Sequence, residues 1–168
     1  MSPKLELQLK EKYPKILKDM YGDVMKTCMH FGIETGDGWY NLLDSLMHNI
    51  QRYCDKPERN VQLVAAQIKT KFGDLRFYFD LHSKYGNEFE YVSNENDYNV
   101  FHALINYAED ISAVTCEICG NKAKTFHMGW HGTYCEHHAQ ERFGDKLLDL
   151  HKKLEEDTLD ENQQTETV

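Results

Sequence analysis

The strongest constraint on the fold is a group of thiol and imidazole ligands in the C-terminal third of the chain. They form a C-x2-C pair and a C-x2-H pair with fifteen residues between the pairs: Cys116, Cys119, Cys135 and His138. Two ligands separated by two residues can wrap around one tetrahedral ion, and Gly120 permits the tight turn that follows. Thiolate and imidazole donors favour zinc. The spacing therefore predicts a zinc knuckle over residues 116–138.

The identity of the fourth ligand has alternatives. His138 repeats the spacing of the first pair and is our prediction, but the adjacent His137 competes with it, and His127 and His131 lie within reach. Four protein ligands leave no coordination position for water, so we expect a structural Zn²⁺. A catalytic zinc would have one protein ligand fewer and a base nearby, and the sequence has no H-E-x-x-H motif.

Length and charge indicate one compact domain with an acidic end. The chain has 168 residues, 40% of them hydrophobic, and a net charge of −9, which argues against non-specific binding of nucleic acid. Six acids and no base fall in residues 155–168, so most of the excess charge belongs to this segment. We predict a single domain over 1–156 that includes the knuckle, and a disordered acidic tail over 157–168.

Targeting signals are not evident in the sequence. No run approaches the ~20 apolar residues that a membrane-spanning helix needs, and the first residues lack the apolar core of a signal peptide. We expect a cytoplasmic protein without a membrane partner.

Helical periodicity appears in four places, the last of them at Phe143, Leu147, Leu150 and Leu154. Apolar residues from Trp39 to Tyr53 and from Phe101 to Ile111 recur every three or four positions, which predicts helices over 39–54 and 97–114. Asp37 is a candidate cap of the first, and Asn96 or Asp97 of the second. A further helical segment spans 5–20, where we expect Pro14 to begin a second helix.

Between the helices the apolar period changes to two. Residues 61–81 form two alternating runs around Gly73-Asp74, which predicts a β-hairpin with these two residues as its turn. The predicted cross-strand pairs are Phe72 with Leu75, Lys71 with Arg76, Thr70 with Phe77, Lys69 with Tyr78 and Ile68 with Phe79. Phe89 and Tyr91 are candidates for a third strand. The sequence thus predicts an α+β fold, with a small antiparallel sheet covered by helices and a C-terminal zinc knuckle.

One face of the predicted hairpin is basic. Placing Lys71 opposite Arg76, with Lys69 beside them, is unfavourable unless negative charge compensates. A carboxylate such as Asp80, or one from the loop around Asp37, could compensate, and so could an anionic ligand. Lys69, Lys71, Arg76 and Tyr78 are therefore candidate residues for binding a phosphate or nucleotide, and the alternative is an ordinary solvated face.

Several motifs taken together resemble a group of small, mostly uncharacterised bacterial and bacteriophage zinc-knuckle proteins. The resemblance covers about residues 36–139 and includes the motifs GDGW from Gly36, Q-x-K-x-K-F-G-x-L-R-F-Y from Gln67, C-x-x-C-G from Cys116 and C-x-x-H-A from Cys135. It implies the four ligands named above and draws attention to Trp39 and the basic hairpin residues. It carries no established activity.

Three functions remain as hypotheses. The first is a non-catalytic, zinc-stabilised binding protein, which the resemblance suggests is phage-encoded and acts in the host cytoplasm on a host component, such as one of its defences, or on a phage protein. The second is a protein that binds or sequesters a small anionic, nucleotide-like ligand through the basic hairpin face. The third is a zinc-dependent hydrolase. No catalytic residue can be singled out from the sequence.

Overall fold

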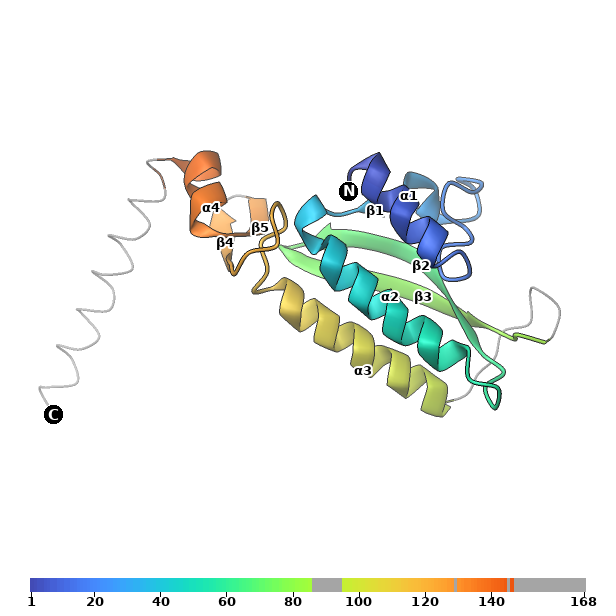
Figure 1. The fold of residues 1–168 in the computed structure, drawn as a ribbon. Helices are drawn as coiled ribbons and strands as arrows, with labels where there is room; N and C mark the ends of the chain where they lie inside the picture. Colours follow the sequence, from blue (N-terminus) through green and yellow to red (C-terminus); the bar gives the residue numbers. More distant parts are fainter. Residues whose placement is uncertain (86–94, 129, 145, 147–168) are drawn as a thin grey trace, which may run out of the picture. The chain divides into compact units, whose positions relative to one another are not determined.

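A computed structural model describes residues 1–85, 95–128, 130–144 and 146 (Figure 1). The contacts divide the chain into two compact units, Met1–Tyr134 and Cys135–Val168. The predicted single domain over 1–156 stays a prediction, and the predicted tail over 157–168 lies outside the described residues.

The first unit contains a three-stranded sheet, which confirms the predicted α+β class. Its strands are β1 (Ile33–Glu34), β2 (Gln62–Lys71) and β3 (Asp74–His82), in the order β1-β2-β3. β1 runs parallel to β2, and β2 and β3 form the antiparallel hairpin. The segment proposed as a third strand, around Phe89 and Tyr91, lies outside the described residues, and β1 was not predicted because two residues show no period.

The hairpin exists, but the predicted pairing within it is wrong. Its turn is Phe72-Gly73 rather than Gly73-Asp74, so Lys71 lies opposite Asp74, Lys69 opposite Arg76 and Ile68 opposite Phe77. Both turn residues have positive φ, 55° at Phe72 and 89° at Gly73, as a type I′ turn requires. A register shift between Ala65 and Gln67 then changes the pairing farther along, where Ala65 meets Phe79.

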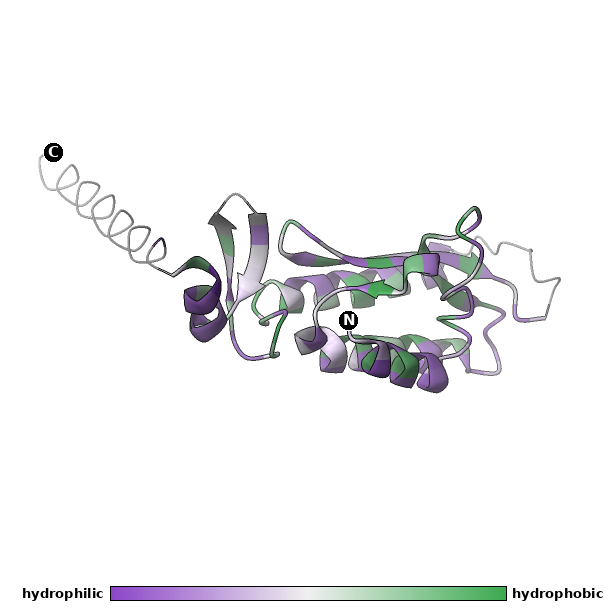
Figure 2. Ribbon diagram, turned by 90° about the horizontal axis from the view of Figure 1, so that it is seen from above, coloured by the Kyte–Doolittle hydropathy of each residue, from purple (hydrophilic) through white to green (hydrophobic). Residues whose placement is uncertain are grey.

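Two helices cover one face of this sheet (Figure 1). α2 (Tyr40–Cys54) follows a short 3-10 helix, η2 (Asp37–Trp39), and packs on β2, whereas α3 (Glu95–Ser112) packs on β3 and on α2. Both helices were predicted. Figure 2 shows apolar and polar residues alternating along the strands. Apolar side chains of the sheet and of the helices form one core. Its fully buried members include Trp39, Leu43, Met47, Ile68, Leu75 and Phe101.

The expected helix caps have other partners. The Asp37 carboxylate accepts the N–H of Ser2 (2.6 Å), the residue before α1. Asp97 is 2% exposed within the first turn of α3, where it accepts hydrogen bonds from Tyr53 (2.6 Å) and Arg59 (2.8 Å). Asp97 therefore fastens α3 to the end of α2 and the residues after it.

The N-terminal segment differs from the prediction. α1 spans Pro3–Lys12, but residues 14–21 form turns rather than the helix expected to begin at Pro14. The apolar side chains of this segment are buried all the same: Ile16, Leu17 and Met20 belong to the main core. The Ile16 carbonyl accepts the Ala65 N–H (2.8 Å), so the segment hydrogen-bonds to β2 instead of completing a helix.

The remaining elements in the described part of the chain are two strands, one α-helix and one short 3-10 helix. The helix expected over residues 143–154 lies mostly outside the described residues. Within the first unit, β4 (Lys124–Met128) and β5 (Trp130–Tyr134) form an antiparallel ribbon. α4 (Glu136–Phe143) belongs to the second unit, and another 3-10 helix, η1 (Cys28–Phe31), precedes β1. Among the described residues, no helix has both the length and the apolar composition that crossing a membrane requires.

Candidate metal centre

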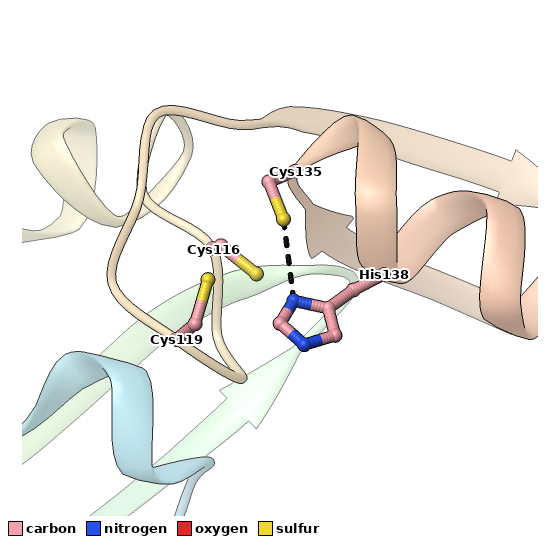
Figure 3. Close-up of side chains that lie close together, drawn as sticks. All are labelled: Cys116, Cys119, Cys135 and His138. Carbon is pink, nitrogen blue, oxygen red and sulfur yellow. Dashed lines mark hydrogen bonds between the residues drawn. The ribbon is translucent and has the colours of Figure 1, made fainter.

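The structure brings together the four residues predicted as metal ligands. One donor atom from each of Cys116, Cys119, Cys135 and His138 lies within 4.8 Å of the others (Figure 3). The Cys135 Sγ lies 3.2 Å from His138 Nδ1. Cys116 and Cys135 are buried and Cys119 is exposed. Three thiols and one imidazole this close together could bind a metal ion.

The competing histidine directly precedes His138 on α4 and does not belong to the cluster of three cysteines and His138. One donor atom of its ring lies within 4.8 Å of donor atoms of His138 and Glu141. His137 has a side chain that is 74% exposed, and its Nε2 lies 3.4 Å from the Glu141 carboxylate. The His138 side chain is only 16% exposed. His131 also differs from His138, because its ring contacts Phe72 with 5.6 Å between the ring centroids. For His127 the structure describes no side-chain position.

The loop of the first Cys pair is closed by backbone hydrogen bonds. The Gly120 N–H donates to the Cys116 carbonyl (2.8 Å), and Gly120 has a φ of +78°, which glycine adopts without strain. The Cys116 N–H donates to the Asn121 carbonyl (2.7 Å). The chain therefore turns back on itself between the two thiols, as the sequence predicted.

This knuckle packs directly on the Gly36–Trp39 turn. A Cβ atom on Gly38 would lie 2.2 Å from the Cys116 carbonyl oxygen and 2.7 Å from the Cys119 nitrogen, and one on Gly36 would lie 2.1 Å from the Glu117 carbonyl oxygen. Real Cβ atoms do not approach so closely, so both positions require glycine. The two glycines of the GDGW motif are thus explained by the backbone of the C-x-x-C-G motif.

Glu117 is a structural residue that the sequence reasoning missed. Its carboxylate accepts hydrogen bonds from the Gly36 N–H (3.0 Å) and the Thr70 hydroxyl, and its carbonyl accepts the Gly38 N–H (2.9 Å). Its own N–H donates to the Thr133 carbonyl (2.9 Å). One residue between the two thiols therefore joins the glycine turn, β2 and β5, and its only sequence signal was its place inside the C-x2-C spacing.

Trp39 makes the second link between the knuckle and the core. The indole is fully buried, and its Nε1–H donates to the Thr115 carbonyl (2.8 Å), next to Cys116. A buried indole needs such an acceptor, because an unpaired buried N–H is costly. The hydrogen bond ties the chain entering the knuckle to the start of α2.

The tip of the hairpin contacts the β4–β5 ribbon. The Gly73 carbonyl accepts the hydroxyl proton of Thr133 (2.7 Å), a residue with no exposed surface. A Cβ on Gly73 would lie 2.9 Å from Thr125 Cγ2. The ribbon thus packs closely around the turn, which gives a reason for glycine at the second turn position in addition to its φ.

The four predicted ligand-binding residues of the hairpin share one face but do not act as one group. Lys69 lies opposite Arg76, so the unfavourable pairing of like charges persists in the actual register. The Lys69 ammonium lies 5.8 Å from the centre of the exposed Tyr78 ring, and that of Lys71 lies 5.5 Å from the Phe72 ring. The two lysines therefore contact aromatic rings.

Arg76 instead contacts carboxylates of the protein itself. Its guanidinium lies 3.4 Å from Asp74 and 3.4 Å from Glu109 on α3, two carboxylates that were not among those considered from the sequence. Burial raises the pKa of the Glu109 carboxyl, although Arg76 and the Phe77 N–H act in the opposite direction. The positive charge of Arg76 is thus compensated internally, and it is less available to an anionic ligand than its sequence position suggested.

The remaining buried thiol has no chemical role that the structure supports. Cys54 is fully buried at the end of α2, and burial raises its pKa to about 11. A thiol with this pKa stays protonated at neutral pH and is a poor nucleophile.

Comparisons with protein-family models, curated proteins and solved structures found no match to this chain.

Proposed function

We propose that the protein is a non-catalytic binding protein whose fold is stabilised by one structural Zn²⁺ held by Cys116, Cys119, Cys135 and His138. The observation that carries the proposal is the clustering of these four donor atoms within 4.8 Å. Four protein ligands complete a tetrahedral zinc shell and leave no position for a substrate or an activated water.

The surroundings of the knuckle support a structural role for the metal. The Cys116–Gly120 loop contacts the Gly36–Trp39 turn, β2 and β5 through its backbone and the Glu117 side chain. A bound ion would fix the loop that these segments share. Zinc binding would therefore contribute to the free energy of folding, because the unfolded chain offers no assembled site.

Metal analysis and unfolding of the purified full-length chain test this proposal. We expect one zinc per chain and a large fall in the thermal midpoint after chelation, with recovery when Zn²⁺ is restored. Cys116→Ser should lose zinc and stability, whereas the matched variant Cys28→Ser, outside the cluster, should lose neither. A zinc-free protein with an unchanged thermal midpoint would contradict the proposal.

A second pair of variants identifies the fourth ligand. His138→Ala should lower zinc affinity strongly, while His137→Ala should leave it near the wild-type value, because the His137 side chain is mostly exposed and lies outside the four-residue cluster. The opposite result would assign the imidazole ligand to His137.

Cobalt substitution distinguishes this proposal from a zinc hydrolase. Co²⁺ bound by three thiolates and one imidazole should give a tetrahedral absorption spectrum that added azide or phosphate does not alter. A spectrum that changes with these anions would reveal an open coordination position and favour hydrolase chemistry instead.

The proposed partner is a protein. From the resemblance of motifs described above we infer that a phage encodes this chain and that the partner belongs to the infected host.

A further inference from the structure

Phe72 occupies an unfavourable place for an aromatic residue. It is the first residue of the two-residue hairpin turn and has a φ of +55°, in the left-handed region that glycine and asparagine prefer. Its side chain is nevertheless 64% exposed. Burial of the ring therefore offsets little of the strain that this backbone conformation imposes.

Tyr21 provides a useful contrast. It is the other described non-glycine residue with positive φ, at 65°, and its hydroxyl donates a hydrogen bond to the buried Glu6 carboxylate. The backbone conformation of Tyr21 is thus coupled to a buried interaction. The contacts of Phe72 are weaker: the Lys71 ammonium lies 5.5 Å from the ring centre, and the centre of the His131 ring lies 5.6 Å from it in an edge arrangement.

The turn beneath Phe72 is held in place. The Gly73 carbonyl accepts a hydrogen bond from the buried Thr133 hydroxyl (2.7 Å), and the Gly73 Cα faces Thr125 and Gly132 too closely for a side chain. A ring presented from such a fixed base loses little conformational freedom on binding, which favours affinity.

The charges behind the turn indicate the chemistry of a partner. Among the described residues, neither Lys69 nor Lys71 forms an ion pair within 4.0 Å, although Arg76 on the same face forms two. Two lysines whose ammonium groups form no ion pair within the described part of the chain are complementary to acidic groups. Glu34 lies beside Lys69, Asp74 lies opposite Lys71, and Asp80 lies on the same face. A long run of negative charge such as a nucleic acid would therefore be repelled more than a few carboxylates at the rim of a protein pocket.

We propose that this hairpin tip, consisting of Phe72 with Lys69 and Lys71 behind it, is the docking surface for a protein partner. Phe72 enters an apolar pocket of the partner, and the two lysines face carboxylates at the rim of that pocket. Aromatic residues are enriched in the buried centre of protein interfaces, and charged residues lie at the rim. The inference rests on the proposed function as a binding protein and names the surface that performs it.

Site-specific photo-crosslinking tests the surface. A benzophenone amino acid replaces Phe72 in the full chain, expressed in the cells that naturally contain it, and Tyr107, a 68% exposed residue of α3, carries the same probe as a control. We expect one discrete protein adduct at position 72 that is absent at 107. The adduct should disappear when Lys69→Glu and Lys71→Glu are added.

Other crosslinking outcomes would overturn the proposal. A nuclease-sensitive adduct would identify a nucleic acid as the occupant, and an adduct with a second copy of this chain would identify self-association. Equal adducts, or no adduct, at positions 72 and 107 would show that the tip is not a specific docking surface.

The partner identified by crosslinking is then purified on its own, and affinity measurements with it distinguish a binding role of Phe72 from a structural one. Phe72→Asn should weaken binding about tenfold or more, consistent with losing an aromatic anchor, whereas Tyr107→Ser should not change it. Because asparagine suits a type I′ turn, Phe72→Asn should leave the thermal midpoint unchanged or raise it. A lowered midpoint would mean that Phe72 is retained for stability, which would overturn the proposal.

The two proposals can fail separately. If zinc removal unfolds the chain but position 72 gives no specific adduct, the docking surface is wrong and the structural zinc stands. If the adduct forms in a chain that binds no zinc, the structural zinc is wrong and the docking surface stands.

Discussion

The four predicted ligands of the zinc knuckle and the basic face of the β2–β3 hairpin were both singled out from the sequence, but they behave differently in the structure. Cys116, Cys119, Cys135 and His138 converge as predicted. The hairpin residues share a face and then separate: Arg76 bonds carboxylates, while Lys69 and Lys71 contact rings. A short-range spacing predicts a ligand set well, whereas the role of a charged strand residue depends on which side chains other segments bring to it.

The largest expected effect concerns the contact between the knuckle and the glycine turn. Gly38→Ala would place a Cβ within 2.7 Å of three backbone atoms of the knuckle, which cannot move as a flexible side chain would. We expect a loss of about 3 kcal/mol or more in the free energy of unfolding, together with weaker zinc binding. Urea denaturation and zinc titration measure the two effects.

Gly144→Ala is the matched control for this variant. Gly144 has a φ of 52° and a ψ of −129°, which alanine rarely adopts, but no described residue lies within 4 Å of a Cβ there. Alanine should therefore cost about 2 kcal/mol of backbone strain without any steric clash. Equal costs at Gly38 and Gly144 would show that the close packing of knuckle and turn does not matter for stability.

The next effect concerns the Trp39 link to the knuckle. Trp39→Phe removes the hydrogen bond to the Thr115 carbonyl and leaves space in the core, so we expect a cost of about 2 kcal/mol. Equilibrium unfolding at saturating Zn²⁺ measures it. A cost no greater than that of an exposed substitution such as Tyr107→Phe would argue against this link.

A smaller effect separates the two kinds of basic residue on the hairpin. Arg76→Glu would place a third carboxylate beside Asp74 and Glu109, and we expect it to lower stability by about 1 kcal/mol. Lys71→Glu should change stability by less than about 0.5 kcal/mol, because Lys71 is exposed. Chemical denaturation measures the free energy of unfolding of both variants. Similar losses would mean that the carboxylate contacts do not set Arg76 apart from Lys71.

The smallest effect is a dependence of stability on pH from Glu109. Burial raises its pKa above the ordinary value of 4.5, so the folded state holds this proton more tightly than the unfolded state does. Its contribution is therefore greatest below pH 4.5 and decreases as the pH rises through the raised pKa. Glu109→Gln should remove this part of the profile in urea denaturation across that range. An unchanged profile would show that Glu109 does not contribute to it.

The period of two along the strands explains why the hairpin was predicted but its cross-strand pairs were not. The alternation of Ile68, Thr70, Leu75 and Phe77 predicts which residues share a face, and that prediction is correct. Moving the pairing by two residues, however, leaves every side chain on the same face. The predicted pair Ile68–Phe79 and the observed pair Ile68–Phe77 satisfy the pattern equally. The choice was made by the turn, where Gly73 packs against Thr125 and Thr133 from a ribbon more than fifty residues later.

The sequence by itself determined the ligand spacing, the apolar stripes of α2 and α3, and the strand period, because each depends on residues close together along the chain. Only the tertiary structure decided that Gly36 and Gly38 accommodate the knuckle, that Glu117 joins three segments and that Glu109 compensates Arg76. These contacts connect residues 33 to 81 positions apart. No local period records such a contact, since it arises only when the folded core brings the segments together.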